Sequence, residues 1–340
     1  MKIQMIKTGL AFCCFVSLLF LSACDHDTDT FDGPSLVNRF GEFMLVEPLT
    51  LSTRTVDFSA GEEVSFGASF NKEVEWLVEI KGLESGSIKI VDGFSNELDD
   101  VNSIWDGGAS TLPLFKLERC AIELIIPSAD SLRFYDTVEV TGLKAYEGSL
   151  FTDFEEDLGT NLVFGNFEFE FTNQTGRRDN LPEGAGQGDW AYYFEGTDAN
   201  VPNFFVGLVD ISAQVTGETY IPLPTTDPED VFFNAFLYTD GGPFGIAVVQ
   251  FIFDSNDSGA FEDGQDQTFQ LPGDFPLSGT GWQHISHSMS ETGITETQLE
   301  KLVGIRILLI SDMNSQPSPP LQVDYGIDFL TFTQGGPLEL

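Results

Sequence analysis

Six aromatic side chains in the carboxyl-terminal half of the sequence could stack on a ligand. They are Trp190, Tyr192, Tyr193, Tyr220, Tyr238 and Trp282. Sites for sugars combine flat apolar rings, which pack on the C–H faces of pyranoses, with a few amides or carboxylates that bind hydroxyl groups. Tyr192 and Tyr193 are neighbours on an expected strand, so they point to opposite faces, and at least one face belongs to the core. Trp190, Tyr192, Tyr193 and Trp282 are the candidate ligand-binding residues, with burial as the alternative for each.

Two acidic residues, Asp153 and Glu155, form a second candidate site. They are two positions apart, so in an extended segment both project from the same side and offer the hard oxygen ligands that Ca²⁺ prefers. The alternative is an ordinary acidic strand end, since 54 acidic residues make such pairs common by coincidence. Residues 254–259 begin like a calcium loop of the EF-hand type. The twelfth position is Gln265 instead of the required glutamate, so the sequence favours a long hairpin loop there, with a surface calcium site as the alternative.

Signatures of enzyme chemistry are absent from the sequence. It contains no His-Glu-x-x-His motif, no Gly-x-Ser-x-Gly elbow and no P-loop. His284 and His287 are three apart on an expected strand, so they point to opposite faces and cannot jointly hold a metal. A glycosidase needs only two carboxylates in a cleft, so a jelly-roll glycoside hydrolase remains an alternative. We find no paired-acid motif of the kind that such enzymes display, and we predict a protein that is not an enzyme.

The elements that would position these residues are almost all strands. Residues 64–70 and 74–80 alternate apolar and polar side chains with the period of two that is typical of half-buried strands. Further short runs at 87–91, 120–126 and 137–140 give the spacing of a small β-sandwich. Residues 58–64 and the Trp-Asp-Gly-Gly turn at 105–108 are similar to those of bacterial immunoglobulin-like and PKD-like spacer domains. Residues 36–147 are therefore expected to form such an Ig-like domain.

A second series of strands follows an acidic segment at residues 148–159. Its apolar runs are 167–171, 190–194, 204–209, 231–238, 245–253, 282–289, 303–310 and 327–332. About eight strands in this length suit a jelly roll. One short helix is expected at residues 295–302, where Thr295 and Gln298 could form a capping box. The predicted fold class is all-β, with an N-terminal Ig-like β-sandwich followed by a larger jelly-roll β-sandwich.

Five stretches of the second series carry a more specific resemblance. They are Phe-Thr-Asp-Phe-Glu at 151–155, Tyr-Tyr-Phe-Glu-Gly-Thr at 192–197, Gly-Trp-Gln-His-Ile at 281–285, Ile-Arg-Ile-Leu-Leu at 305–309 and Ile-Asp-Phe-Leu-Thr-Phe at 327–332. With these, residues 150–340 resemble a galactose-binding-like carbohydrate-binding module. The resemblance implies a non-catalytic glycan-binding domain of the kind found on surface lipoproteins of polysaccharide-utilisation systems. It also implies a structural calcium that joins the first and last strands, with Asp328 as partner to Asp153 or Glu155; no cofactor is required.

The amino terminus has the layout of a secretory signal. Lys2 and Lys7 precede an apolar run at residues 10–21, which is shorter than the ~20 residues of a membrane span. Leu-Ser-Ala-Cys at 21–24 resembles the lipobox of bacterial lipoproteins, which implies that residues 1–23 are removed and that Cys24 is lipidated. An ordinary cleaved signal is the alternative.

The segment after Cys24 and the overall charge limit the location and the partners. Residues 24–35 are acidic and poor in apolar side chains, so we expect a flexible tether. An acidic run at this position resembles the surface-export signal of lipoproteins in the phylum Bacteroidota; a linker that faces the periplasm is the alternative. The formal charge of −39 repels phosphate backbones, which excludes nucleic acid and favours neutral molecules, cations or basic protein surfaces. Cys120 lies in a strand-like run and is expected to be a buried, inert thiol.

Together these features predict a lipid-anchored lipoprotein of the outer membrane, exposed at the cell surface, that binds glycans as an accessory to polysaccharide capture. Outer-membrane transport proteins are expected as further partners. The alternatives are a structural or adhesive surface lipoprotein that binds a protein partner, and the jelly-roll glycoside hydrolase.

Overall fold

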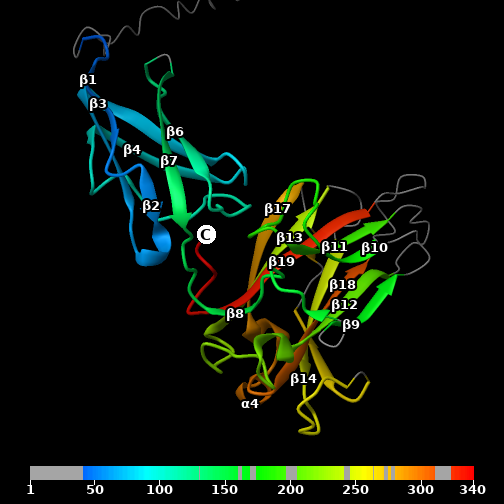
Figure 1. The fold of residues 1–340 in the computed structure, drawn as a ribbon. Coiled ribbons are helices and arrows are strands. Elements are labelled where there is room, and N and C mark those ends of the chain that lie inside the picture. Colours follow the sequence, from blue (N-terminus) through cyan, green and yellow to red (C-terminus); the bar gives the residue numbers. More distant parts are fainter. Residues whose placement is uncertain are drawn as a thin grey trace, which may run out of the picture.

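The computed structural model describes residues 41–129, 131–159, 163–168, 174–196, 205–240, 246–262, 264–271, 275–276, 280–310 and 323–340. The predicted signal peptide, the lipidation site Cys24 and the acidic tether lie outside these residues. Figure 1 shows two groups of strands that meet where β7 is followed by β8. We call β1 to β7 the first module and β8 to β19 the second module. No helix in the described ranges has the length and apolar character needed to cross a membrane.

The first module is a seven-stranded sheet linked through its longest strand. Its strands are β1 (Leu45–Leu51), β2 (Thr55–Asp57), β3 (Val64–Gly82), β4 (Ile88–Leu98), β5 (Ile104–Trp105), β6 (Arg119–Ile126) and β7 (Leu132–Gly142). The order is β1-β3-β6-β7-β2, with β4 and β5 also paired to β3, and only the β2–β7 pair is parallel among the described pairings of this module. Alternate side chains of β3 are buried, as the period of two predicted.

The second module is a sandwich of two six-stranded antiparallel sheets. One sheet, here the β19 sheet, consists of β8 (Ser149–Thr152), β10 (Gln174–Arg178), β11 (Ala191–Gly196), β13 (Val231–Thr239), β17 (Gly281–Ser288) and β19 (Val323–Gln334). The other, the β18 sheet, consists of β9 (Val163–Glu168), β12 (Phe205–Ser212), β14 (Ile246–Phe253), β15 (Gln267–Gln270), β16 (Phe275–Pro276) and β18 (Leu302–Ile310). Their orders are β10-β11-β19-β13-β17 and β15-β14-β18-β12-β9, with β8 on β19 and β16 on β14.

The core of the second module lies between these two sheets. Phe194, Phe233 and Phe332 enter it from the β19 sheet, and Val209 and Phe251 enter it from the β18 sheet. Because strands bury alternate residues, the side chains between these positions form the outer face of each sheet. The predicted all-β fold class is confirmed.

Helices are short connectors in the described residues. They are the 3₁₀ turns η1 (Phe58–Ala60), η2 (Ala213–Thr216) and η3 (Met289–Thr292) and the helix α4 (Glu296–Leu299). At α4 the backbone N–H of Thr295 donates to Oε1 of Gln298 over 3.0 Å, which is one half of the predicted capping box. The helix ends earlier than predicted because β18 begins at Leu302.

Candidate functional site

The outer face of the β19 sheet carries a row of aromatic side chains. Strand register places Tyr193 of β11 opposite Gly326 of β19, Gly326 opposite Tyr238 of β13, and Tyr238 opposite Trp282 of β17. Paired residues point to the same side of a sheet, so the three rings form one line, here the aromatic row. The ring centroids are 6.0 Å apart for Tyr193 and Tyr238 and 5.5 Å apart for Tyr238 and Trp282.

Gly326 allows the rings to close over β19. A Cβ atom at this position would lie 3.0 Å from the Trp282 ring and 3.3 Å from the Tyr193 ring. Any larger residue would therefore push these rings away from the strand. The row thus depends on a glycine at the centre of the sheet as well as on the aromatic residues.

Carboxylates lie beside the aromatic row. Glu195, Asp324 and Asp240 are each two positions from a member of the row or from Gly326, so on extended backbone they belong to the same face. Burial, together with the negative charges of Asp324, Asp240 and Glu195, raises the pKa of Tyr193 above its ordinary value. We call Glu195, Asp240 and Asp324 the carboxylate row. Arg178 of β10 is ion-paired to Glu195 over 2.5 Å, and its guanidinium lies 5.7 Å from the Tyr193 ring centroid.

A loop covers one end of the aromatic row. We call residues 181–190 the covering loop. The indole N–H of Trp282 donates to the carbonyl oxygen of Gly184 over 3.0 Å, and Gly186 lies so close to the same ring that a Cβ there would be 3.0 Å away. Tyr193, Tyr238 and Trp282 are only 2%, 5% and 8% exposed. Tyr193 and Trp282 were predicted as ligand-binding aromatics, with burial as the alternative, and neither presents an open ring face because both are packed over.

The other two predicted aromatics have different positions. Tyr192 faces the sandwich core, where its ring centroid is 5.3 Å from that of Phe194, so it cannot contact a ligand on the outer face. Trp190 precedes β11 and is half-buried, and the guanidinium of Arg177 stacks on its ring with a 3.5 Å distance to the centroid. One face of Trp190 is therefore already used by a cation. The prediction that Tyr192 and Tyr193 point apart agrees with this arrangement.

The structure brings the three acidic residues predicted for calcium into one neighbourhood. Asp328 is completely buried, and its carboxylate accepts hydrogen bonds from the backbone N–H groups of Gln187 at 2.8 Å and Phe329 at 2.7 Å. Burial raises the pKa of Asp328 well above its ordinary value, and the negative charges of Glu155 and Asp153 raise it further. Oε1 of Glu155 accepts the backbone N–H groups of Asp189 and Trp190, at 2.8 and 2.9 Å.

The carboxylates of Asp153, Glu155 and Asp328 are the right type of ligand for a hard cation, but their side chains do not converge on one point. Carboxylate oxygens are the ligands of Ca²⁺, and a cation would offset the repulsion that Asp328 experiences from Glu155 and Asp153. Among the described residues, however, no three His, Cys, Asp or Glu side chains converge closely enough to hold a metal. Asp153, Glu155 and Asp328 would hold the ion only after a rearrangement of their side chains, so the calcium site stays a proposal.

No protein-family model matches the sequence, and no curated protein matches it. Solved structures similar to this chain include a surface glycan-binding protein from a complex xyloglucan utilization locus in Bacteroides uniformis, with 14% identity, 85% of this chain and 73% of that chain covered, and a TM-score of 0.36. A surface glycan-binding protein from Prevotella bryantii shows 11% identity, 81% and 73% coverage and a TM-score of 0.34. A tandem of carbohydrate-binding modules from Paenibacillus barcinonensis shows 10% identity, 86% and 94% coverage and a TM-score of 0.34. Likenesses this distant assign no function to the chain.

The remaining polar candidates are structural. Asp254 accepts the backbone N–H groups of Asn256, Ser258 and Gly259, so its oxygens order the loop between β14 and β15. His284 contacts Oδ1 of Asn234, whereas His287 contacts Glu291, so the two imidazoles do not share a ligand. These contacts agree with the predicted hairpin loop and with the predicted separation of the histidines.

Cys120 is an inert thiol in this structure. Its side chain is fully buried, and burial, assisted by the charges of Glu118 and Glu139, raises its pKa to about 12. The thiolate is the reactive form, so a thiol with this pKa is a poor nucleophile at neutral pH.

The carboxylate row was missed by the sequence reasoning. A signal existed for two of its members, because Glu195 follows Tyr193 by two positions and Asp240 follows Tyr238 by two, which puts each acid on the face of its aromatic neighbour. Asp324 carried no such signal, since only the pairing of β19 with β11 and β13 brings it between the other two.

Calcium and pH are expected to act together on Asp328. A folded-state pKa raised above the unfolded value of ~3.9 means that the folded chain keeps a proton which the unfolded chain has released. Without calcium, the stability contributed by Asp328 is therefore lost as the pH rises from about 4 toward the raised pKa. A calcium ion bound at Asp328 would replace that proton, so it should stabilise more at higher pH, by about 2.7 kcal/mol at a hundredfold excess over Kd.

Thermal unfolding with excess calcium and with a chelator, across a range of pH, measures this effect. Asp328→Asn should remove both the calcium response and the pH-dependent decline. Asp100→Asn, an exposed aspartate of the first module, serves as the matched control. A melting temperature that is unchanged by calcium in the unmodified chain would refute the site.

Proposed function

We propose that this chain binds neutral glycans without catalysis, and that the outer face of the β19 sheet is the binding site. The observation that carries the proposal is the aromatic row with the carboxylate row beside it on one sheet face. The rings of Tyr193, Tyr238 and Trp282 offer C–H stacking surfaces, and the carboxylates accept hydrogen bonds from sugar hydroxyls.

Access to the rings requires movement of the covering loop. The indole N–H of Trp282 holds the loop at Gly184, and Glu155 accepts the backbone N–H groups of Asp189 and Trp190 at its other end; such bonds contribute about 1 kcal/mol each. Only the end of the loop at Gly184 has to move to expose the indole, and a ligand that stacks there would offset the loss of the bond to Gly184. Glu195 is paired with Arg178, and the negative charges of Asp240 and Asp324 disfavour carboxylated or sulfated chains, so the site selects neutral polymers.

We further infer the cellular setting from the sequence. Residues 1–23 act as a signal peptide, a lipid on Cys24 anchors the chain to the outer membrane, and residues 24–35 form the tether that presents the modules outside the cell. The first module is an Ig-like spacer, and its seven strands support this interpretation. Outer-membrane transport proteins are the partners that would receive a captured glycan, and a structural Ca²⁺ at Asp153, Glu155 and Asp328 completes the second module.

Affinity electrophoresis against a panel of soluble polysaccharides, both neutral and acidic, tests the function. We expect retardation by at least one neutral polymer and by no acidic polymer. Asp324→Asn should weaken binding about tenfold or more, because charge-assisted hydrogen bonds contribute about 1.5–3 kcal/mol. Asp100→Asn should leave binding unchanged.

Two results would contradict the proposal. One is the absence of binding to every neutral polymer in the panel. The other is the release of new reducing ends from a bound polysaccharide, which would favour the glycoside hydrolase alternative. If no glycan binds, capture of an outer-membrane protein by the Cys24→Ala form would favour the adhesive alternative.

A further inference from the structure

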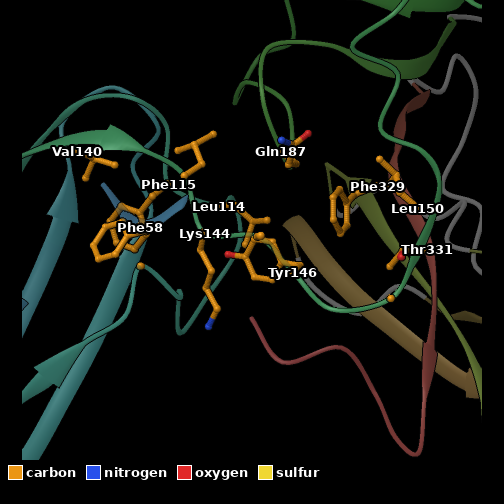
Figure 2. A pocket seen from close by; sticks show the side chains of 14 residues that line it. Phe58, Leu114, Phe115, Val140, Lys144, Tyr146, Leu150, Gln187, Phe329 and Thr331 are labelled. Atoms are coloured by element: carbon orange, nitrogen blue, oxygen red, sulfur yellow. The ribbon is translucent and has the colours of Figure 1, made fainter. Parts of the chain in front are cut away.

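A pocket lies between the two modules (Figure 2). Its volume is about 190 Å³. Phe58 and Phe115 line it from the first module, Phe329 lines it from β19, and Tyr146 lines it from the segment that connects the modules. The Tyr146 and Phe329 rings meet edge to face with centroids 5.9 Å apart. The pocket is therefore walled by aromatic rings from both modules.

A larger polar groove adjoins this pocket. It has a volume of about 780 Å³ and shares Lys144, Ala145, Tyr146 and Gly148 with the pocket. Its other lining residues are Asp106, Glu147, Pro224 and residues 333–339 at the end of the chain. Amide, hydroxyl and carboxylate groups thus rim the opening of an aromatic pocket.

The walls of the pocket are held in place by contacts between the modules. The backbone N–H of Leu114 donates to the carbonyl oxygen of Gly186 over 2.8 Å, and Lys116 forms an ion pair with Asp189 over 2.7 Å. Within the second module, Leu338 is buried and its backbone N–H donates to Oδ1 of Asn234 over 2.9 Å, which fixes the segment that lines the groove. A preformed cavity binds a ligand at a lower entropic cost than one that must first be assembled.

Hydroxyl acceptors are provided by the groove. Glu147 and Glu339 line it, and both side chains are exposed, so their carboxylates can accept hydrogen bonds from ligand hydroxyls. Lys144 is already neutralised by Asp106 at 2.7 Å, and Glu147 lines the adjoining groove, so the junction has no excess of cations for an acidic ligand.

We propose that the module junction is a second binding site, which takes the terminal ring of a neutral oligosaccharide in the pocket and the following sugars in the groove. The pocket of about 190 Å³ is larger than the roughly 150 Å³ cavity that holds benzene, so it admits one six-membered ring, while the hydroxyl groups of a pyranose extend toward the groove. Aromatic walls receive its C–H faces, and the carboxylates of the groove receive hydroxyls of the following sugars. This inference rests on the proposed glycan-binding function and adds recognition of chain ends to it.

The test uses a variant that fills the opening shared by the pocket and the groove. Ala145 is exposed and lines both, so Ala145→Trp should block entry without removing an existing contact. Ala260→Trp, in the loop between β14 and β15, is the matched control. Calorimetric titration with a short oligosaccharide of the polymer that binds best should give two sites for the full chain and the control, and one site for Ala145→Trp.

A second variant is needed in case the tryptophan of Ala145→Trp separates the two modules and disrupts the fold at the junction. Tyr146→Leu removes an aromatic ring that lines both the pocket and the groove and lies outside the covering loop, so we expect about tenfold weaker binding at the junction and unchanged binding at the β19 sheet. If neither variant changes the number of sites or the affinity, the junction proposal fails while the sheet site stands. If Asp324→Asn has no effect and Ala145→Trp abolishes all binding, the sheet site fails and the junction stands. If no oligosaccharide binds, both fail.

Discussion

Replacing Arg306 with leucine is expected to lower the free energy of unfolding of the second module by about 3–5 kcal/mol. Arg306 of β18 lies opposite Asp210 of β12, and the two side chains form a bidentate pair, with Nε to Oδ1 at 2.6 Å and Nη2 to Oδ2 at 2.7 Å. Asp210 is 2% exposed, so loss of the guanidinium leaves a buried carboxylate without its cation. Such a charge cannot be rehydrated without disturbing the sheet.

A double variant shows how much of the lost unfolding free energy comes from the unpaired carboxylate and how much from the loss of the ion pair itself. Asp210→Leu combined with Arg306→Leu should recover most of the lost stability, since apolar residues can replace a buried ion pair at little cost. A small buried apolar cluster lies on the same strands, β12 and β18, and on the adjacent strand β14, which favours this replacement. It consists of Leu208, Leu308 and Val248. Urea unfolding of the full chain, followed by circular dichroism, measures both variants.

A matched surface pair provides the control. Arg119 and Glu139 are 3.5 Å apart and both largely in water, so Arg119→Leu should have little effect on unfolding. The account fails if Arg306→Leu is no more destabilising than Arg119→Leu, or if the double variant is as unstable as the single one.

Trp105→Ala is expected to destabilise the first module by about 3–5 kcal/mol. The indole is completely buried, its N–H donates to the carbonyl oxygen of Gly108 over 2.9 Å, and Phe58 and Phe115 contact it edge-on with centroids 4.7 and 4.9 Å away. Removal of this ring leaves a cavity that the surrounding strands can fill only in part. In a module of this size each kcal/mol lowers the melting temperature by roughly 4–8 °C.

The same variant reports on the module junction. Phe58 and Phe115 also line the junction pocket, so a loss of Trp105 should loosen one wall of that pocket as well. Scanning calorimetry should show that the unfolding transition of the first module shifts to lower temperature. Phe94 is 66% exposed, so Phe94→Ala should change the unfolding free energy of this module by no more than about 0.5 kcal/mol. A Trp105→Ala chain with an unchanged transition would contradict the assignment of this residue as the centre of the core.

Part of the fold and of the candidate site could be predicted from local pattern. The alternation along residues 64–80 predicted strand β3, and the spacing of Thr295 and Gln298 predicted the start of α4, because both depend on neighbours in the sequence. The short strands β2, β5 and β16 have only two or three residues, which is too little pattern to detect. The burial of Trp282 was not predictable either, because the residues that cover it lie about a hundred positions earlier in the chain.

The sequence by itself determined that the chain is built from half-buried strands, that its surface is acidic, and that Tyr192 and Tyr193 occupy opposite faces of one strand. These properties follow from composition and from the two-residue repeat of extended backbone, which act within a few positions. Only the tertiary structure decided that Tyr193, Tyr238 and Trp282 form one row, that Asp324 joins the acids beside it, and that the two modules enclose an aromatic pocket. Strand register and module docking are set by packing between segments that are far apart in the chain, and a local pattern carries no information about which distant partner a strand will meet.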